Sequence, residues 1–444
     1  MSHSTFQAGA YRTNITPPVG ICLAGVFHEV RAVDVLDELY ANAVVLDDGG
    51  DEGEVAIVSV DNCAIPTDVY QDIAALVQQS SGIPEDRVIV TATHTHSGPA
   101  IGLDLDGIYE VWPDYVCHFK RQVASAVRLA QLRKRDAQLA AGKGRNRDYV
   151  FNRRLRRPDG TPVMNFIADK PGLLDCAPTG AIDSEVVVLR VEDAQGRPMA
   201  FLVNYCNHNN AMTDPLISAD YAGVMGNHLK AVFGQDVIVL FLPGPAGNVN
   251  WIDSQDPNQW SPALYQKIGK SLAGTVLEID ARMEAIDPPS VRVARCKVPV
   301  RERPYRDYDV TVDGTFGRPE DNMDFWTAYR TAYERYKDAP LPVHEVDLRA
   351  VTFGNSAALC TNPAELFAEY GLAIKAGSPF EYTLVAELTN GLVGYVPTPE
   401  AFDFGGYEVR KMPGTSYLAT DAGEQIVRGS LELLRRQTTD DRRQ

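Results

Sequence analysis

The sequence predicts an α/β fold, with a mixed, partly parallel β-sheet as its core and helices flanking the sheet. Residues 55–60 and 87–92 are short apolar runs typical of buried strands, and the segment between them, 70–80, has a helical pattern. Two buried strands joined by a helix form a βαβ unit, so we expect this pair to be parallel. Two further apolar runs, 185–191 and 199–205, flank a turn that contains glycine, and they predict an antiparallel pair.

The other expected elements follow from the same two periodicities. Strands are predicted at 39–47 (half-buried, because its residues alternate), 137–141, 237–242, 290–300, in two runs after Glu345, and at 382–388. Helices are predicted at 112–132, 221–233, 261–283 and 423–435. Another helix is predicted to start at Asn362 as its N-cap, with Pro363 at the first helical position and Glu365 in the first turn. We find no internal repeat and no linker, so we expect one domain over residues 1–444, with a peripheral insertion near 303–343 that carries one helix.

Composition and charge favour a small molecule as the partner. Hydrophobic residues make up 45% of the chain and charged residues 23%, as in ordinary folded domains. Acidic residues outnumber basic ones by 59 to 42, and the net charge of −17 argues against binding to nucleic acid or to an anionic membrane. The first ten residues lack the pattern of a secretion signal, and no run of 18 apolar residues occurs. We therefore expect a cytoplasmic protein; the sequence does not indicate an oligomeric state.

The seven cysteines occur singly and form no CxxC pair. This distribution is typical of reduced, mostly buried thiols and not of a disulfide framework or a cysteine-based zinc site. A metal site in this chain would therefore use histidine and carboxylate ligands.

The segment Val88–Pro99 carries the most informative motif. An apolar run ends there in Thr93-His-Thr-His-Ser-Gly-Pro99, with two histidines at i and i+2. In an extended chain, side chains two residues apart point the same way, so His94 and His96 would face one small volume at the end of a strand. Open α/β sheets bind ligands at that edge. The alternative is a polar loop with two solvated histidines.

Other strand exits carry functional side chains too. His208 follows the strand at 199–205, a Gly/Pro loop ending at Asn250 follows 237–242, and Tyr395 lies beyond 382–388. Simple structural roles suffice for the remaining histidines: His3, His28, His118, His228 and His344. Two histidines, a carboxylate and an open position form the usual catalytic zinc arrangement. The basic residues around Asn152 would either bind an anionic or hydroxylated substrate or form an ordinary solvated loop.

With these motifs in place, the sequence resembles the neutral (alkaline) ceramidase superfamily, zinc amidases that split the N-acyl bond of ceramide. The resemblance runs in order from about residue 9 to about residue 412. It rests on Thr93–Pro99, on Val203–Met212 with Ile217–Asp220, on Asn152-Arg153, on Asn362–Glu365 and on Asn390–Tyr395.

The resemblance implies a role for each matched residue. His94, His208, Glu365 and Tyr395 are the implied ligands of one zinc ion per chain, His96 is the implied catalytic residue that contacts substrate and moves protons, and Arg153 is implied to line the site. The chain departs from the family at Asn250, which stands where family members have a serine. Asparagine cannot be acylated, so we expect Asn250 either to donate a hydrogen bond to the oxyanion or only to cap the turn before Trp251.

The sequence therefore predicts a zinc-dependent hydrolase that uses metal-activated water to cleave an amide bond of a small soluble substrate. An ester, lactone or imide would suit the same groups, and manganese or iron is not excluded as the metal. One alternative is a metal-dependent lyase or isomerase acting through an enolate, and another is a non-catalytic ligand-binding relative.

Overall fold

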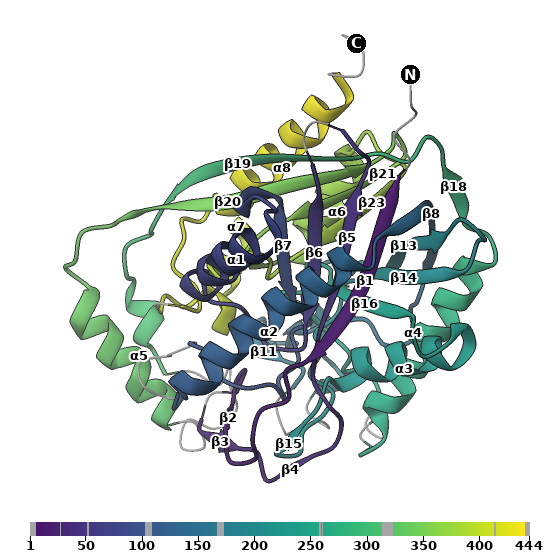
Figure 1. Cartoon of the computed structure of the whole chain (residues 1–444). Helices are drawn as coiled ribbons and strands as arrows, with labels where there is room; N and C mark the ends of the chain where they lie inside the picture. Colours follow the sequence, from purple (N-terminus) through teal and green to yellow (C-terminus); the bar gives the residue numbers. More distant parts are fainter. Residues whose placement is uncertain are drawn as a thin grey trace.

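The computed structural model describes residues 6–26, 28–50, 53–102, 109–166, 173–256, 259, 261–312, 323–412 and 414–439. Two β-sheets lie face to face, and helices cover their outer faces (Figure 1). A hydrophobic core that joins residues of both sheets fills the space between them. This architecture confirms the predicted α/β fold with a mixed sheet, and it adds a second sheet that the sequence analysis did not separate from the first.

The larger sheet has nine strands in the order β16-β14-β13-β8-β1-β5-β6-β7, with β18 also paired to β8. The pairs β6/β7 and β14/β16 are parallel, and the other pairs in this sheet are antiparallel. The strands are β1 (Gln7–Asn14), β5 (Tyr40–Asp47), β6 (Val55–Val60), β7 (Val88–Ala92), β8 (Arg135–Arg145), β13 (Glu185–Asp193), β14 (Pro198–Tyr205), β16 (Ile238–Pro243) and β18 (Glu284–Ile286).

The second sheet contains β19 (Val291–Arg301), β20 (Val343–Phe353), β21 (Ala357–Thr361) and β23 (Tyr382–Ala386), of which only β21 and β23 are parallel. Shorter strands complete the loops: β2 (Cys22–Leu23), β3 (Val30–Arg31), β4 (Asp34–Val35), β9 (Phe151–Asn152), β10 (Arg154–Arg156), β11 (Pro162–Met164), β12 (Ala177–Pro178), β15 (Leu216–Ile217), β17 (Val249–Asn250), β22 (Ala364–Leu366) and β24 (Gly394–Val396).

Helices form the outer layers. In Figure 1, α1 and α2 lie in front of β5–β7, α3 and α4 lie beside β14 and β16, and α8 crosses β19 and β20. Their bounds are α1 (Thr67–Ser81), α2 (Pro113–Leu132), α3 (Asp220–Phe233), α4 (Leu264–Asp280), α5 (Met323–Tyr336), α6 (Ala368–Gly377), α7 (Pro399–Phe404) and α8 (Ala422–Thr439). None of the helices in the described ranges combines the length and hydropathy that a bilayer crossing requires.

Strand β5 is buried on both faces, so the predicted half-burial of 39–47 is wrong. Ala43 and Val45 belong to the core beneath the helices, whereas Val44 and Leu46 belong to the core between the sheets. The alternation in the sequence is therefore one between two apolar faces, because the second sheet covers the face that we expected to be solvated.

The predicted helix start at Asn362 is also wrong. Residues 364–366 form the short strand β22, and helix α6 begins only at Ala368. The Asn362 side chain still accepts a hydrogen bond from the backbone N–H two residues on, at Ala364, but it stabilises a turn into a strand. Asn-Pro followed by a short apolar run suits either structure, and pairing with β24 decides the outcome.

The segment near 303–343 lies at the edge of the fold, where α5 stands out at the left of Figure 1. Residues 313–322 are outside the described residues. Trp326 and Tyr329 of α5 are nevertheless buried, in a hydrophobic cluster that also contains Tyr395 and Tyr407. One face of this segment therefore supports the wall behind a predicted site residue.

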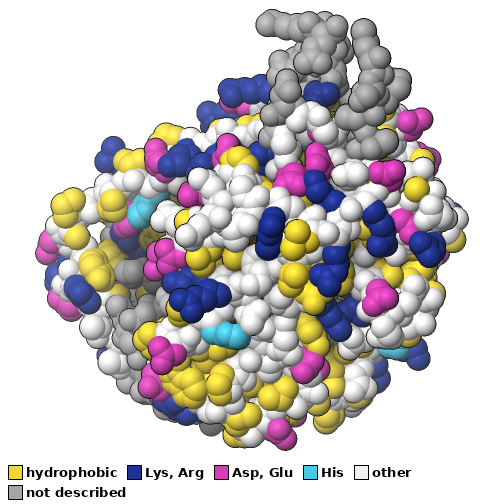
Figure 2. Space-filling model, in the orientation of Figure 1, with side chains coloured by type: hydrophobic (Ala, Val, Ile, Leu, Met, Phe, Trp, Pro, Cys, Tyr) yellow, Lys and Arg dark blue, Asp and Glu magenta, His cyan; other side chains and the backbone are white. Residues whose placement is uncertain are grey.

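The surface drawn in Figure 2 mixes acidic and basic side chains, and hydrophobic side chains gather at its lower end, where β2–β4 and β15 lie in Figure 1. Val19, Val33, Val35 and Leu36 are among the exposed large hydrophobic residues of the described chain.

Candidate active site

Three histidines meet at the carboxyl ends of strands in the larger sheet. His94 and His96 follow β7, and His208 follows β14. The ring centroids of His94 lie 4.7 Å from those of His96 and 4.6 Å from those of His208. His94 and His208 are buried, and His96 is partly exposed. The structure thus brings together the three histidines that the sequence analysis selected.

The turn after β7 brings the His94 and His96 rings together, although we expected an extended strand end to do so. His94 has φ of 64°, in the left-handed region, so the segment is a turn and not an extended strand end. Gly25 packs directly on the His96 ring: a Cβ at this glycine, which itself has φ of 101°, would lie 2.6 Å from the ring. Only glycine fits here, so the loop before β3 holds His96 in place.

Backbone carbonyls fix the ring orientation of both buried histidines. Nδ1 of His94 donates to the carbonyl of Cys63 at 2.8 Å, and Nδ1 of His208 donates to the carbonyl of Val249 at 2.9 Å. With the proton on Nδ1, Nε2 of each ring keeps its lone pair. This is the way in which proteins orient histidines that bind metal ions.

Glu365 completes the cluster. Its Oε2 lies 3.7 Å from Nε2 of His94 and 3.6 Å from Nε2 of His208, and this buried oxygen has no hydrogen-bond partner among the described residues. Strands β22 and β24 run parallel and place Glu365 directly beside Tyr395. A buried carboxylate oxygen left without a partner, facing two imidazole lone pairs, fits a divalent cation of the kind that takes nitrogen and oxygen ligands.

Tyr395 is buried, and its hydroxyl accepts a hydrogen bond from the Tyr407 hydroxyl at 2.7 Å. Burial, together with the Glu365 carboxylate, raises the pKa of Tyr395 well above its ordinary value. Tyr395 is therefore a neutral phenol at the edge of the cluster. This is the state that we expect of the implied fourth ligand before a cation binds.

Arg153 reaches the cluster from the strand exit of β9. Its guanidinium donates to Nε2 of His208 at 2.9 Å, to the Gly247 carbonyl at 2.8 Å, and also to the side chains of Tyr407 and Glu408. Since a lone pair of His208 cannot serve Arg153 and a metal ion at once, a bound ion would replace that one hydrogen bond. The other three would keep Arg153 at the wall of the site.

Desolvation and the neighbouring imidazoles of His94 and His208 lower the pKa of His96 well below its ordinary value. Desolvation lowers the pKa of His208 in the same direction, with a contribution from Arg153. All three rings are therefore neutral at neutral pH, which is the state that binds metal and accepts protons.

Asn250 lies in β17, one residue after the carbonyl that fixes His208. Its amide forms two reciprocal hydrogen bonds of 2.8 Å with the amide of Asn165, and its oxygen also accepts the N–H of Ile252. These contacts occupy the amide in holding the loop, which favours the turn-capping alternative over a donor for the oxyanion.

Sequence reasoning missed two residues that hold the site. Glu387 is fully buried and accepts the backbone N–H groups of Ala246 and Leu366, while burial and the nearby Glu365 raise its pKa well above the ordinary value. Glu408, also fully buried, forms ion pairs with Arg153 and Arg154. A single acidic residue at the end of the apolar run 382–388 was the available signal for Glu387; Glu408 had none.

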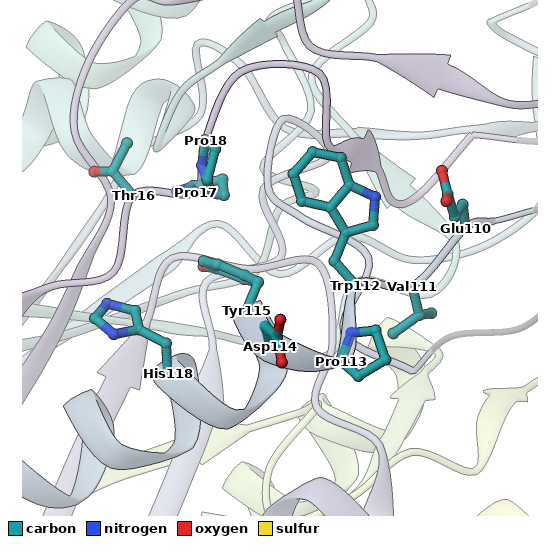
Figure 3. Close-up of a pocket in the computed structure, with 10 residues that line it drawn as sticks. All are labelled: Thr16, Pro17, Pro18, Glu110, Val111, Trp112, Pro113, Asp114, Tyr115 and His118. Carbon is teal, nitrogen blue, oxygen red and sulfur yellow. The ribbon is translucent and has the colours of Figure 1, made fainter.

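A surface pocket lies away from the histidine cluster, beside the start of α2. It has a volume of about 760 Å³, and Figure 3 shows Trp112, Tyr115 and His118 of the α2 region facing Pro17 and Pro18 across it. None of the three clustered histidines lines it. The pocket therefore belongs to a different part of the surface from the metal-binding candidates.

Comparisons with known proteins place the chain in a family. The family model described as neutral/alkaline non-lysosomal ceramidase, N-terminal, matches residues 6–237, more than half of the chain. The chain belongs to this family. The matched range includes His94, His96, Arg153 and His208, whereas Asn250, Glu365 and Tyr395 lie beyond it.

Relatives in this family agree with the match. The chain is 28% identical to neutral ceramidase B of Dictyostelium discoideum over 178 residues, which are 37% of this chain and 23% of that protein. It is 28% identical to neutral ceramidase A of the same organism over 185 residues, 39% of this chain and 24% of that protein. The match thus spans about a quarter of the length of these curated relatives.

Solved structures show the same fold over almost the whole chain. The neutral ceramidase of Pseudomonas aeruginosa superposes with a TM-score of 0.75 at 18% identity, covering 97% of this chain and 74% of that one. A structure of ceramidase complexed with C2 gives a TM-score of 0.77 at 17% identity, covering 97% and 75%. The likeness confirms the fold in the regions of Glu365 and Tyr395, which the family model does not reach.

Proposed function

We propose that this protein is a zinc-dependent hydrolase that cleaves the amide bond of an N-acyl compound. The observation that carries the proposal is the convergence of His94, His208 and the unpartnered Oε2 of Glu365. Membership in the neutral ceramidase family supports an amide as the bond, and zinc is one of the metals that takes this set of nitrogen and oxygen ligands.

In the proposed site, His94, His208 and Glu365 hold the ion, and Tyr395 stands beside Glu365 as a fourth ligand. A zinc ion there would polarise the amide carbonyl and lower the pKa of a water molecule towards neutrality. The buried positions of both histidines and their fixed Nδ1 contacts keep the ligand atoms oriented before substrate arrives.

His96 is the proposed general base and acid. Its Nε2 lies 3.3 Å from Nε2 of His94, and it is the one member of the histidine cluster with appreciable exposure. It therefore stands where a substrate would enter, within reach of the attacking water and of the leaving nitrogen. Arg153 supplies a fixed positive charge on the opposite wall, where we assign it to the carbonyl oxygen.

We propose that the substrate is a water-soluble N-acyl compound that the protein meets in the cytoplasm. The net charge of −17 and the asparagine at position 250, where the family has a serine, support a soluble substrate. We also propose that Asn250 stabilises its loop and takes no part in the reaction. The reciprocal hydrogen bonds between Asn250 and Asn165 support this structural role.

The test compares hydrolysis of an N-acyl amino acid with that of a short-chain N-acylsphingosine, in water enriched in ¹⁸O. The proposal expects release of a free amine and a carboxylic acid that carries one solvent oxygen, and loss of activity after chelation with recovery on addition of zinc. Products without solvent oxygen would identify a lyase instead. Faster cleavage of the sphingosine compound would overturn the soluble substrate while leaving the hydrolase intact.

A further inference from the structure

The guanidinium of Arg153 is held along one edge, so that its other end points at the histidine cluster. Nε donates to Oε1 of Glu408 at 3.1 Å, and Nη2 donates to the carbonyl of Gly247 and to the hydroxyl of Tyr407. A guanidinium is planar and presents its donors in fixed directions, so fixing Nε and Nη2 also fixes the direction of Nη1. Nη1 lies 2.9 Å from Nε2 of His208.

Glu408 cannot turn away from Arg153, because its second oxygen is held as well. Oε2 accepts a hydrogen bond from Nη1 of Arg154, which is itself only 2% exposed. Cζ of Arg154 lies 5.4 Å from the centroid of the Phe367 ring, and a Cβ at Gly406 would lie 2.4 Å from Nη1 of Arg154. The second arginine is thus enclosed on both sides, and it fixes the carboxylate that holds the first.

Glu408 touches the proposed site only through Arg153. It is completely buried, and within the described part of the chain its side chain pairs with the two arginines and with none of the proposed zinc ligands. No second carboxylate of the described residues forms an ion pair with Arg153. Because a buried charge without a partner is costly, this one carboxylate is what allows a charged guanidinium to lie at this depth.

We propose that Glu408 is a positioning residue, which holds Arg153 so that Nη1 meets the carbonyl oxygen of the substrate. The inference rests on the proposed function, in which Arg153 binds that oxygen. A donor that is already in place when negative charge develops on the oxygen needs no rearrangement during the reaction, and this is what makes such donors effective. Glu408 thus contributes to the reaction through the orientation of Arg153 and does not contact the substrate.

The experiment is a double-mutant cycle between Glu408→Gln and Arg153→Met. It measures hydrolysis by the zinc-loaded proteins of whichever compound the wild type cleaves faster, the N-acyl amino acid or the short-chain N-acylsphingosine. In the wild-type background, Glu408→Gln should lower kcat by about tenfold or more, change KM less than about threefold and leave the zinc content unchanged. In the Arg153→Met background, the same substitution should change kcat less than about twofold, because the group through which it acts is gone.

Asp309→Asn is the matched control. Asp309 is also a completely buried carboxylate that pairs with two arginines, Arg303 and Arg306, and it does not contact Arg153. The control should change kcat per folded molecule less than about threefold, with the folded fraction measured by circular dichroism. It therefore separates the loss of a buried carboxylate in general from the loss of the one that orients Arg153.

An equal fall in kcat in both backgrounds would overturn the proposal, because Glu408 would then only stabilise the turn that contains Tyr407. Unchanged kcat in folded Glu408→Gln would overturn it too. If Glu408→Gln does not fold, the whole cycle is repeated with Arg154→Met present in every protein, which removes the second buried cation, and the same pattern is expected. Absence of turnover by the wild type would instead reject the proposed hydrolase, and the role of Glu408 with it.

Discussion

His94 and His208 lie more than a hundred residues apart in the chain, but their rings are oriented in the same way. Each follows a buried strand, donates from Nδ1 to a backbone carbonyl, and leaves Nε2 facing Glu365. A buried imidazole loses little further entropy when a ligand binds, because its rotamer is already set. The proposed affinity of this site for a metal ion therefore depends on single side chains, each fixed by one hydrogen bond.

His208→Ala should reduce the zinc content of the purified protein from about one ion per chain to less than a tenth, because the remaining ligands cannot complete the site. The control is His228→Ala, which removes an exposed histidine from α3 and should leave the zinc content unchanged. Elemental analysis with far-ultraviolet circular dichroism measures both. Full zinc retention in folded His208→Ala would remove His208 from the site.

Asn250→Ala should lower stability and leave catalysis nearly intact. The substitution removes the donor to the Asn165 side-chain oxygen and the acceptor of the Ile252 N–H, whereas Nδ2 of Asn165 keeps its bond to the Ile252 carbonyl. A buried group left unsatisfied in this way costs about 1–3 kcal/mol. We expect the turnover number, corrected for folded fraction, to change less than about threefold. A fall of about 10² to 10³ at normal stability would instead restore Asn250 as a donor to the oxyanion.

At the scale of elements, the pairing of β22 with β24 sets the position of the carboxylate. Parallel register puts Glu365 beside Tyr395, and the loop after β16 passes directly across the backbone of Glu365. A Cβ at Gly247 would lie 2.5 Å from the carbonyl oxygen of Glu365, closer than real contacts allow. The glycine is therefore required for the loop to approach the ligand strand.

Gly247→Ala should displace Glu365 and weaken zinc binding at least tenfold in a chelator competition titration, because backbone and not a flexible side chain must move. Gly274→Ala is the matched control: this glycine lies inside α4, and a Cβ there meets nothing within 4 Å. The control should bind zinc normally and gain up to about 1 kcal/mol of stability from improved helix propensity. Equal zinc affinity in both variants would contradict the packing argument.

Helix α3 begins with a carboxyl group whose protonation couples to folding. Burial raises the pKa of Asp220 from 3.8 to about 7, so the folded state retains a proton that the unfolded chain releases above about pH 4. Stability from this residue is complete below pH 4 and is lost as the pH rises towards 7.

Asp220→Asn removes that titration but keeps only one of the two oxygens that accept the N–H groups of Met212 and Tyr221, which costs a stability that does not vary with pH. The stability of the variant relative to that of the wild type should therefore rise between pH 4 and pH 8, by up to a few kcal/mol at about 1.4 kcal/mol per unit of pKa shift. Urea unfolding at a series of pH values measures the difference. A difference that does not vary with pH would mean that the native pKa of Asp220 is ordinary.

For the whole molecule, the sequence predicted what depends on local pattern. The βαβ unit around α1, the hairpin of β13 and β14, and most helices lie where periodicity put them, and β8 is longer than the predicted 137–141. The three site histidines were found because each follows an apolar run, and Arg153 because of its place in a family motif. Each of these features depends on a pattern within a few consecutive residues.

What the sequence could not predict depends on tertiary contact. Glu365 was placed on a helix because Asn-Pro suits an N-cap, and only pairing with Tyr395, thirty residues later, makes the segment a strand. The second sheet buries the other face of β5, which no pattern within β5 records. Glu408 is buried by its two arginine partners, far away in sequence.

In the proposed site, His94, His208 and Glu365 hold one zinc ion. The most direct test is a crystal structure of the protein grown with zinc, with diffraction data on both sides of the zinc absorption edge. A single strong anomalous peak is expected within about 2.0–2.2 Å of Nε2 of His94, Nε2 of His208 and a carboxylate oxygen of Glu365. A peak held instead by Cys63 and His96, or no peak at this cluster in a protein that contains zinc, would contradict it.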